Sequence, residues 1–296
     1  MSQTRFIITA ITLILIWGSA FTMVDVAVRS VSPIWVVAGR VSIAAIIIVT
    51  YAYMKGFRLP SLNDVRWLWY GGLGMTGIVI PFFLIGLGQQ TIESGISAIL
   101  IGAMPLMTII LAHFLTDERM TIMKLLGFII GFSGLIVLFL PKDFSLSLVG
   151  DWKAQSFILL AAFFYGITTV FAKRAPETDS NIAAAMMLCA ATIAAIIWAL
   201  FEGLPQTQPD PIAYWMIFLL AVGSTGFATI LYLNMIDIKG PTIMASVNYF
   251  VPVASVIFGI WFLGESFTLQ KLIAFFVIII GVLISRIGSK KAILKA

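Results

Sequence analysis

Residues able to do chemistry are scarce in this sequence. It contains one histidine, His113, and one cysteine, Cys189. These are too few for a nucleophile–base set or for a cluster of metal ligands, and a lone cysteine forms no intramolecular disulfide. We therefore expect no catalytic residue, no cofactor and no metal site, and we expect that the protein is not an enzyme.

One charged side chain falls deep inside an apolar run. Arg40 follows Pro33 by seven residues, which places it roughly 10 Å along a helix that begins at the proline. Charged residues inside apolar spans are costly and usually functional. Two interpretations stay open. Arg40 forms a structural ion pair with Asp25, at the end of the preceding run, or it holds a substrate carboxylate or serves as an outer gate.

Polar and aromatic side chains recur near the middle of the apolar runs, whereas Asp and Glu are absent there. A proton-coupled carrier of lipophilic cations generally needs an acid within the membrane, and a phosphate site needs several cations. We therefore expect a neutral or zwitterionic, fairly apolar substrate of amino-acid size. The candidate cavity residues are Trp17, Phe82, Met104, Tyr165, Tyr232, Asn248 and Tyr249. Ordinary packing is the alternative interpretation for each of them.

Prolines inside three of these runs predict irregular helices. A proline in a membrane helix leaves a backbone carbonyl one turn earlier without its partner. We expect kinks at Pro81, Pro105 and Pro252, where freed backbone groups can face a cavity.

The elements that must position these side chains are membrane helices. Of the 296 residues, 61% are hydrophobic and only 10% are charged, against roughly a quarter charged in soluble domains. A segment isolated in lipid satisfies its own backbone groups only as a helix. We predict an all-α polytopic membrane protein with no soluble domain. The ten predicted transmembrane helices lie near residues 6–24, 34–54, 67–88, 96–115, 122–140, 154–172, 182–201, 212–233, 243–263 and 269–285.

Lys and Arg set the predicted orientation, because loops rich in these residues stay in the cytoplasm. With the N-terminus inside, most of them fall in cytoplasmic connectors. Apart from Arg40 inside a span, the exceptions are Arg29, Lys142, Lys153 and Lys271, which fall on the outer side. We expect both termini in the cytoplasm. The net charge of +5 then reflects topology and contact with the lipid bilayer, and we expect no nucleic-acid partner.

Two segments of the chain are alike. Residues 105–137, moved along by 147, fall on residues 252–284. The informative matches are Pro105 with Pro252, Glu118 with Glu265, Thr121 with Thr268, Lys124 with Lys271 and Gly134 with Gly281. Chance explains such matches poorly, so we predict a tandem duplication. Its parts are a five-helix repeat over 1–140, a periplasmic linker over 141–151, a second repeat over 152–288 and a cytoplasmic basic tail over 289–296.

Five spans is an odd number, so the two repeats would enter the membrane from opposite sides. We predict two inverted five-helix repeats around a shared site, as in many secondary transporters. Glu118 and Glu265 fall in the turn before the last span of each repeat. A negative side chain there interacts favourably with the positive N-terminal end of the next helix. We therefore interpret both glutamates as turn or cap residues, with a gating role as the alternative.

The sequence resembles the ten-span EamA-type branch of the drug/metabolite transporter superfamily, over essentially its whole length. The resemblance rests on "LILIWGSAF" at 13–21, "RVSIAA" at 40–45, the segment from Pro105 to Glu118 and its copy from Pro252 to Glu265. Within that family the chain looks most like bacterial exporters of aromatic and neutral amino acids.

The resemblance implies an inner-membrane secondary transporter that exports small neutral metabolites, most of all amino acids, by alternating access. By analogy, residues around Trp17, Met104, Tyr165 and Asn248 line its site. The alternative is a carrier of another cargo, such as lipophilic drugs, sugars or nucleotide precursors. We expect a small-molecule substrate as the partner, and a monomer.

Overall fold

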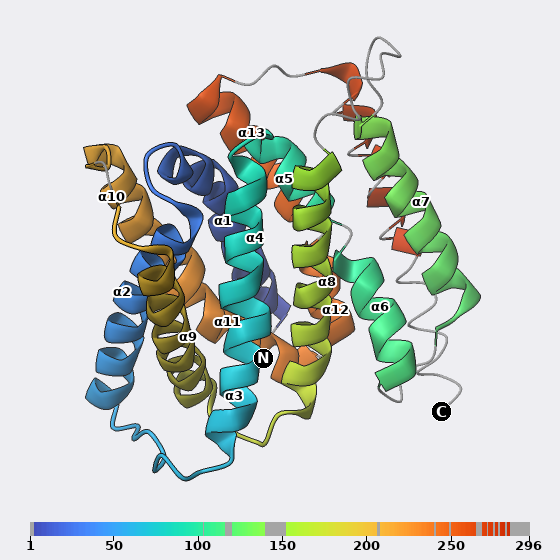
Figure 1. Cartoon of the computed structure of the whole chain (residues 1–296). Coiled ribbons are helices and arrows are strands. Elements are labelled where there is room, and N and C mark those ends of the chain that lie inside the picture. The colour runs from blue at the N-terminus through green and yellow to red at the C-terminus, as the bar shows by residue number, and fades with distance from the viewer. Residues whose placement is uncertain are drawn as a thin grey trace.

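Helices make up every regular element that the structure describes (Figure 1). A computed structural model describes residues 3–102, 104–115, 120–139, 152–205, 208–239, 241–248, 250–264, 268–270, 272–274, 276–277, 279–281 and 283–284. The elements are α1 (Gln3–Val28), α2 (Pro33–Met54), α3 (Arg66–Gly74), η1 (Met75–Val79), α4 (Ile80–Gln89), α5 (Ser94–Ile101), α6 (Met104–Leu115), α7 (Ile122–Phe139), α8 (Trp152–Arg174), α9 (Ser180–Glu202), α10 (Pro211–Leu219), η3 (Leu220–Phe227), α11 (Ala228–Lys239), α12 (Pro241–Asn248) and α13 (Val251–Leu263). For these ranges the expectation of an all-α protein is confirmed.

Several helical segments are long and apolar enough to cross a membrane. Six such segments lie at Gln3–Val28, Pro33–Met54, Arg66–Gln89, Trp152–Arg174, Ser180–Glu202 and Pro211–Lys239. Two of them join three elements into one helix, namely α3 with η1 and α4, and α10 with η3 and α11. Shorter apolar helices lie at Ile122–Gly134 and Val251–Leu263. These segments support a polytopic membrane protein, while ten crossings stay a prediction.

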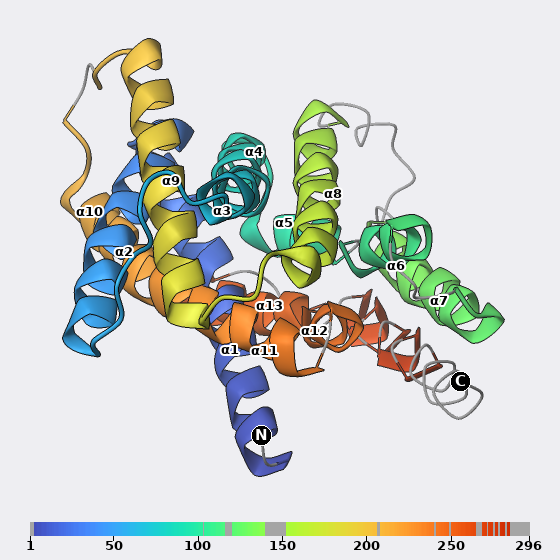
Figure 2. The same ribbon diagram turned by 90° about the horizontal axis from the view of Figure 1, so that it is seen from below.

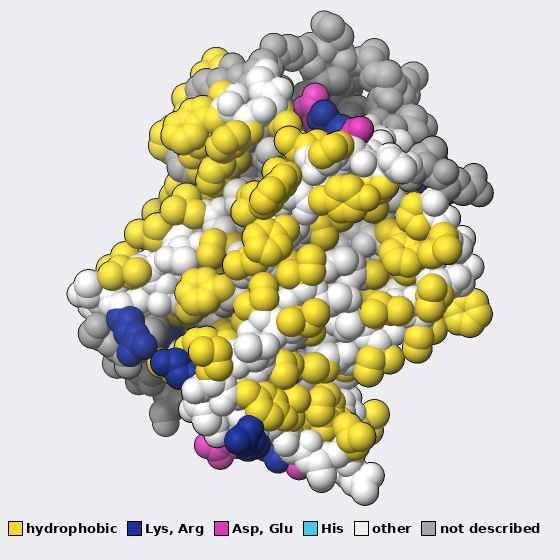
Figure 3. All heavy atoms as spheres, turned by 90° about the vertical axis from the view of Figure 1, so that its left-hand side faces the viewer, with side chains coloured by type: hydrophobic (Ala, Val, Ile, Leu, Met, Phe, Trp, Pro, Cys, Tyr) yellow, Lys and Arg dark blue, Asp and Glu magenta, His cyan; other side chains and the backbone are white. Residues whose placement is uncertain are grey.

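The outer surface of the helices is apolar. Figure 3 shows hydrophobic side chains across the middle of one face, with Lys, Arg, Asp and Glu near its margins. Ile46, Leu68 and Trp261 are 68%, 80% and 75% exposed. Large side chains of this kind are poorly solvated by water and well accommodated by lipid tails.

The fourth and ninth predicted spans each consist of two helices. α5 and α6 are separated at Gly102, and α12 and α13 are separated at Phe250. Pro105 and Pro252 are the second residues of α6 and α13. Proline fits the first turn of a helix because the N–H that it lacks has no helical partner there. Both breaks therefore lie directly before a predicted kink.

The third and eighth predicted spans are continuous helices that contain a wider, π-helical turn. η1 overlaps the sequence "GMTG" at 74–77, and η3 contains "GSTG" at 223–226. Pro81 is the second residue of α4, directly after η1. A π turn inserts an extra residue into a helix, and such turns are frequent at functional sites.

Glycines allow two pairs of helices to pack closely. α1 packs against α13, and α8 packs against α6. A Cβ added to Gly18 would lie 2.5 Å from the Cβ of Ala254, and a Cβ added to Gly166 would lie 3.1 Å from the Cβ of Met107. Gly18 and Gly166 have matching positions in the two predicted repeats, and so do Met107 and Ala254. Small residues at such contacts let helix backbones approach.

The main buried core surrounds the contact between α2 and α9, which pack side by side (Figure 2). Val37 and Val41 of α2 and Ala184, Ala191 and Ala195 of α9 belong to this core and are almost fully buried. Short side chains keep the two helix axes close, so α2 and α9 form a firm centre for the elements around them.

Hydrogen bonds connect loops at both ends of the helices. Tyr70 Oη donates to the Pro176 carbonyl oxygen at 3.0 Å, which joins α3 to the loop after α8. The backbone N–H of Asp210 donates to Ser30 Oγ at 3.1 Å. The loop after α1 therefore lies beside the loop after α9.

Several predicted features lie outside the described residues. They are Tyr249, Glu118, Glu265, the linker over 141–151 and the tail over 289–296. Thr121 is described and caps α7, because its Oγ1 accepts a hydrogen bond from the backbone N–H of Lys124 at 3.3 Å.

Candidate functional site

A cavity lies where the irregular parts of four spans meet. Its volume is about 130 Å³. Both π turns and both helix breaks contribute to its wall, together with α1, α2, α4, α8, α9 and α11. The residues from the π turns and from the ends of the broken helices are Gly77, Ile78, Ser224, Ile101, Met104, Asn248 and Val251.

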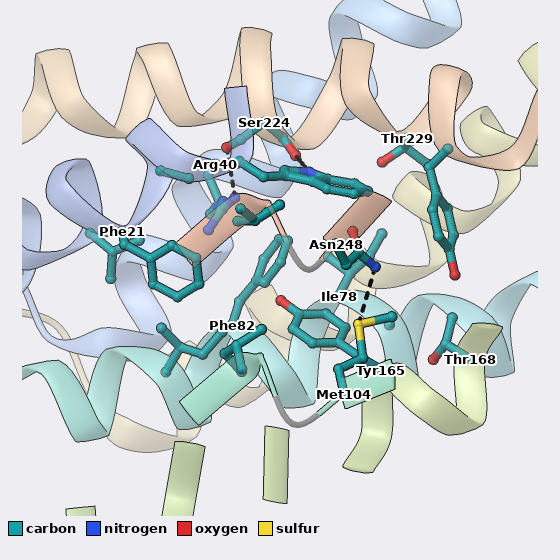
Figure 4. A pocket seen from close by; sticks show the side chains of 18 of the residues that line it. Phe21, Arg40, Ile78, Phe82, Met104, Tyr165, Thr168, Ser224, Thr229 and Asn248 are labelled. Atoms are coloured by element: carbon teal, nitrogen blue, oxygen red, sulfur yellow. Dashed lines mark hydrogen bonds between the residues drawn. The ribbon is translucent and has the colours of Figure 1, made fainter. Parts of the chain in front are cut away.

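Among the described residues that line the cavity, only Arg40 is charged. Its side chain is 4% exposed. Arg40 Nε donates to Thr225 Oγ1 at 2.9 Å. Arg40 Nη2 donates to Ser224 Oγ at 3.1 Å (Figure 4). Its Cζ atom lies 3.7 Å from the centre of the Phe82 ring, as in a cation–π contact. All these partners are neutral, so they orient the guanidinium without neutralising it.

The predicted ion pair between Asp25 and Arg40 does not form. Asp25 instead pairs with Arg29, four residues later and directly after the end of α1. Residues four apart lie on one face of a helix, so Arg29 is the closer partner for Asp25. In the part of the chain that the structure describes, Arg40 has no carboxylate within ion-pair distance.

Aromatic rings form the apolar part of the wall, and neighbours bind the polar ends of two of them. Trp17 Nε1 donates to the Ser224 carbonyl oxygen at 3.3 Å, and the Trp17 ring lies edge-on to the Tyr232 ring at 5.8 Å. Tyr232 Oη hydrogen-bonds to Thr169 Oγ1 at 3.0 Å. Tyr165 points from α8 into the cavity (Figure 4). The rings therefore present mainly apolar surface.

Asn248 and Met104 join the two broken spans across the cavity. Asn248 Nδ2 lies 3.3 Å from the Met104 sulfur, a weak acceptor. The Asn248 side chain is buried, and its Oδ1 has no hydrogen-bond partner among the described residues. A buried polar atom left without a partner costs about 1–3 kcal/mol. A donor on a ligand would remove that cost.

Most of the predicted cavity residues come together in the structure. Those that line the cavity are Trp17, Phe82, Met104, Tyr165, Tyr232 and Asn248. That they bind a substrate stays a prediction.

Sequence reasoning missed Ser224 and Thr225, the two hydroxyl partners of Arg40. Both lie between Gly223 and Gly226, in a segment that repeats the glycine spacing of "GMTG" at 74–77. The sequence signal that could have identified Ser224 and Thr225 was their position between repeated glycines in an apolar run. Their contact with Arg40 depends on the π turn, which hydropathy does not reveal.

Comparison with known families shows what kind of protein contains this cavity. The sequence model of the EamA-like transporter family matches residues 4–140 and matches again over residues 152–287. The chain belongs to the EamA-like transporter family. The resemblance found in the short motifs is confirmed.

The relatives of this EamA-like chain include proteins named as transporters. The uncharacterized transporter YoaV of Bacillus subtilis is 23% identical over 290 residues, which cover 95% of this chain and 96% of YoaV. The uncharacterized inner membrane transporter YedA of Escherichia coli K12 is 23% identical and covers 93% of this chain and 89% of YedA. An Arabidopsis thaliana protein named WAT1-related protein At3g02690, chloroplastic, is 24% identical over 90% of this chain and 66% of its own length. This EamA-like chain is a membrane transporter.

A solved crystal structure has the same fold. It is similar over 95% of this chain and 96% of its own, with a TM-score of 0.73 and 19% sequence identity. Because the sequence identity is only 19%, this similarity supports only the fold of the EamA-like chain.

Proposed function

We propose that this transporter exports small neutral metabolites, most of all amino acids including aromatic ones, across the bacterial inner membrane by alternating access. The observation that carries the proposal is the cavity at the two helix breaks and two π turns. Interrupted helices near the membrane centre commonly form the substrate sites of secondary transporters. Aromatic rings with a few polar groups suit a small, partly apolar ligand.

The size and polarity of the cavity favour amino acids over drug-sized molecules, lipophilic cations and nucleotides. Its volume of about 130 Å³ is below the roughly 300–1,000 Å³ of pockets for drug-sized ligands. Among its described lining residues, carboxylates are absent and Arg40 is the single cation. Lipophilic cations would lack a counter-ion there, and nucleotide phosphates would lack the several cations that they prefer.

We propose further that ten helices form two inverted repeats, over 1–140 and 152–288, with both termini in the cytoplasm. In parallel repeats the loop after α1 would lie on the same side of the membrane as its counterpart, the loop after α8, and on the opposite side from the loop after α9. The hydrogen bond between Ser30 and Asp210 instead joins it to the loop after α9, as an inversion requires. The matching close contacts of Gly18 and Gly166 also support two related units.

Counterflow into liposomes tests the proposed cargo. Liposomes that contain the purified protein are loaded with one unlabelled amino acid and diluted into a labelled one, with protein-free liposomes as the control. We expect transient accumulation of labelled phenylalanine and leucine. Accumulation of sugars or lipophilic cations, without that of any neutral amino acid, would contradict the proposal and support the alternative cargo.

A further inference from the structure

Among the residues that the structure describes, the buried cation Arg40 has no counter-ion. Removal of a charged group from water costs several kcal/mol even after relaxation, unless an opposite charge compensates. The described neighbours of Arg40 are the hydroxyls of Ser224 and Thr225 and the ring of Phe82. These groups supply two hydrogen bonds and a ring face, but no negative charge. The described surroundings of Arg40 therefore leave its charge uncompensated.

Arg40 lies where a ligand in the cavity can supply the missing negative charge. Arg40 lines the cavity, whose other described lining residues are uncharged. Thr225 and Ser224 bind Nε and Nη2, which fixes the plane of the guanidinium. A planar guanidinium held in this way matches the two oxygens of a carboxylate.

We infer that Arg40 binds the carboxylate of the transported molecule. The inference rests on the proposed function, since it treats this cavity as the transport site. A single cation suits one negative charge, whereas a phosphate ester, with more charge, would need further cations. Ser224, Thr225 and Phe82 act as positioning residues, because they orient the guanidinium. The substrate class is thus a molecule with one carboxylate and an apolar or aromatic remainder.

A series of related ligands tests this inference on the full-length protein in detergent. Binding is measured by calorimetry for L-phenylalanine, for L-phenylalaninol, which has a hydroxymethyl group in place of the carboxylate, and for 3-phenylpropionate, which lacks the ammonium group. We expect the wild-type protein to bind phenylalanine at least about tenfold more tightly than phenylalaninol, because a charge-assisted bidentate contact is lost. Equal affinity for the two would overturn the inference without any variant.

Variants then assign the preference to Arg40. We expect Arg40→Gln to bind phenylalanine and phenylalaninol alike, and Arg40→Lys to keep part of the preference, since it keeps the charge without the planar fork. The matched control is Arg58→Gln, which removes an exposed cation in the loop after α2. It should keep the wild-type preference. A preference for the carboxylate that survives in folded Arg40→Gln would overturn the inference, and the wild-type series decides if that variant does not fold.

The outcomes separate this inference from the proposed function. Binding of 3-phenylpropionate in an Arg40-dependent way, without counterflow of any amino acid, would uphold the inference and contradict amino acids as the cargo. Counterflow of amino acids with no preference for a carboxylate would uphold the cargo and contradict the role of Arg40. Absence of binding by all three ligands would count against both.

Discussion

At the scale of single residues, the cavity combines satisfied and unsatisfied polar groups. Trp17 and Tyr232 direct their polar atoms to protein partners. Arg40 lacks a counter-ion among the described residues, and Asn248 Oδ1 lacks a donor. A protein optimised only for stability would pair or replace such groups, because a buried unpaired polar atom is costly. Because both groups lie in the cavity wall, we propose that a ligand completes them.

The unpaired amide oxygen gives a prediction at this scale. Asn248→Ala should lower counterflow of phenylalanine about tenfold, because a ligand donor loses its acceptor. The midpoint of thermal unfolding should fall little or rise, because the substitution also removes a buried unpaired atom. Both quantities are measured on the same purified protein.

Asn63→Ala is the matched control for Asn248→Ala, since Asn63 is exposed in the loop after α2. It should leave transport and unfolding unchanged. Wild-type counterflow in Asn248→Ala would remove Asn248 from the site. A large loss of stability would show that the amide serves folding instead.

At the scale of helices, close packing at glycine holds α1 and α8, which carry much of the cavity wall, against α13 and α6. Gly18→Ala should lower the free energy of unfolding by about 1–3 kcal/mol, because the new methyl group would overlap with Ala254 and the helices must separate. Ala254→Gly in the same chain should restore part of the loss. Denaturant or thermal unfolding in a mild detergent measures both changes.

The control for Gly18→Ala is Gly72→Ala on α3. A Cβ at Gly72 meets no atom within 4 Å, and alanine favours a helix more than glycine does. We expect Gly72→Ala to be neutral or slightly stabilising. Equal effects of the two substitutions would show that packing at Gly18 is not close.

Helix positions were largely predictable from the sequence, and side-chain partners were not. The predicted span over 34–54 agrees with α2 to within one residue at each end, because apolar length sets where a membrane helix begins and ends. The two helix breaks follow from the backbone chemistry of Pro105 and Pro252. The expected pair of Asp25 with Arg40 was wrong, because Arg29, one turn later and directly after the end of α1, is the closer cation.

The cavity was predictable to a similar extent. Large polar or aromatic residues near mid-span, such as Tyr165, could be found because polar groups are costly to place in lipid and stand out in an apolar run. Small residues such as Gly77 and Ser224 line the same cavity and could not be told from ordinary packing positions. Their role depends on the π turns and on how the helices cross, which hydropathy does not encode.

At the scale of the whole molecule, elements from both predicted repeats form one cavity. α1, α2, η1, α4, α5 and α6 come from the first half, and α8, α9, η3, α11, α12 and α13 come from the second. A relative movement of the two halves would therefore change the whole cavity wall, and with it the access of solutes to the cavity. In an inverted pair, an exchange of the two halves' conformations opens the site to the opposite side of the membrane.

Cysteine accessibility from the two sides of the membrane tests the central claim most directly. Ala20 lines the cavity, and Cys189 is the only native cysteine, so Ala20→Cys in a Cys189→Ala chain places one thiol there. A small membrane-impermeant thiosulfonate reagent is added to right-side-out and to inverted vesicles. The account predicts labelling from both sides, with slower labelling when phenylalanine saturates the site. Labelling from one side only, at a rate that phenylalanine does not change, would contradict an alternating-access site in this cavity.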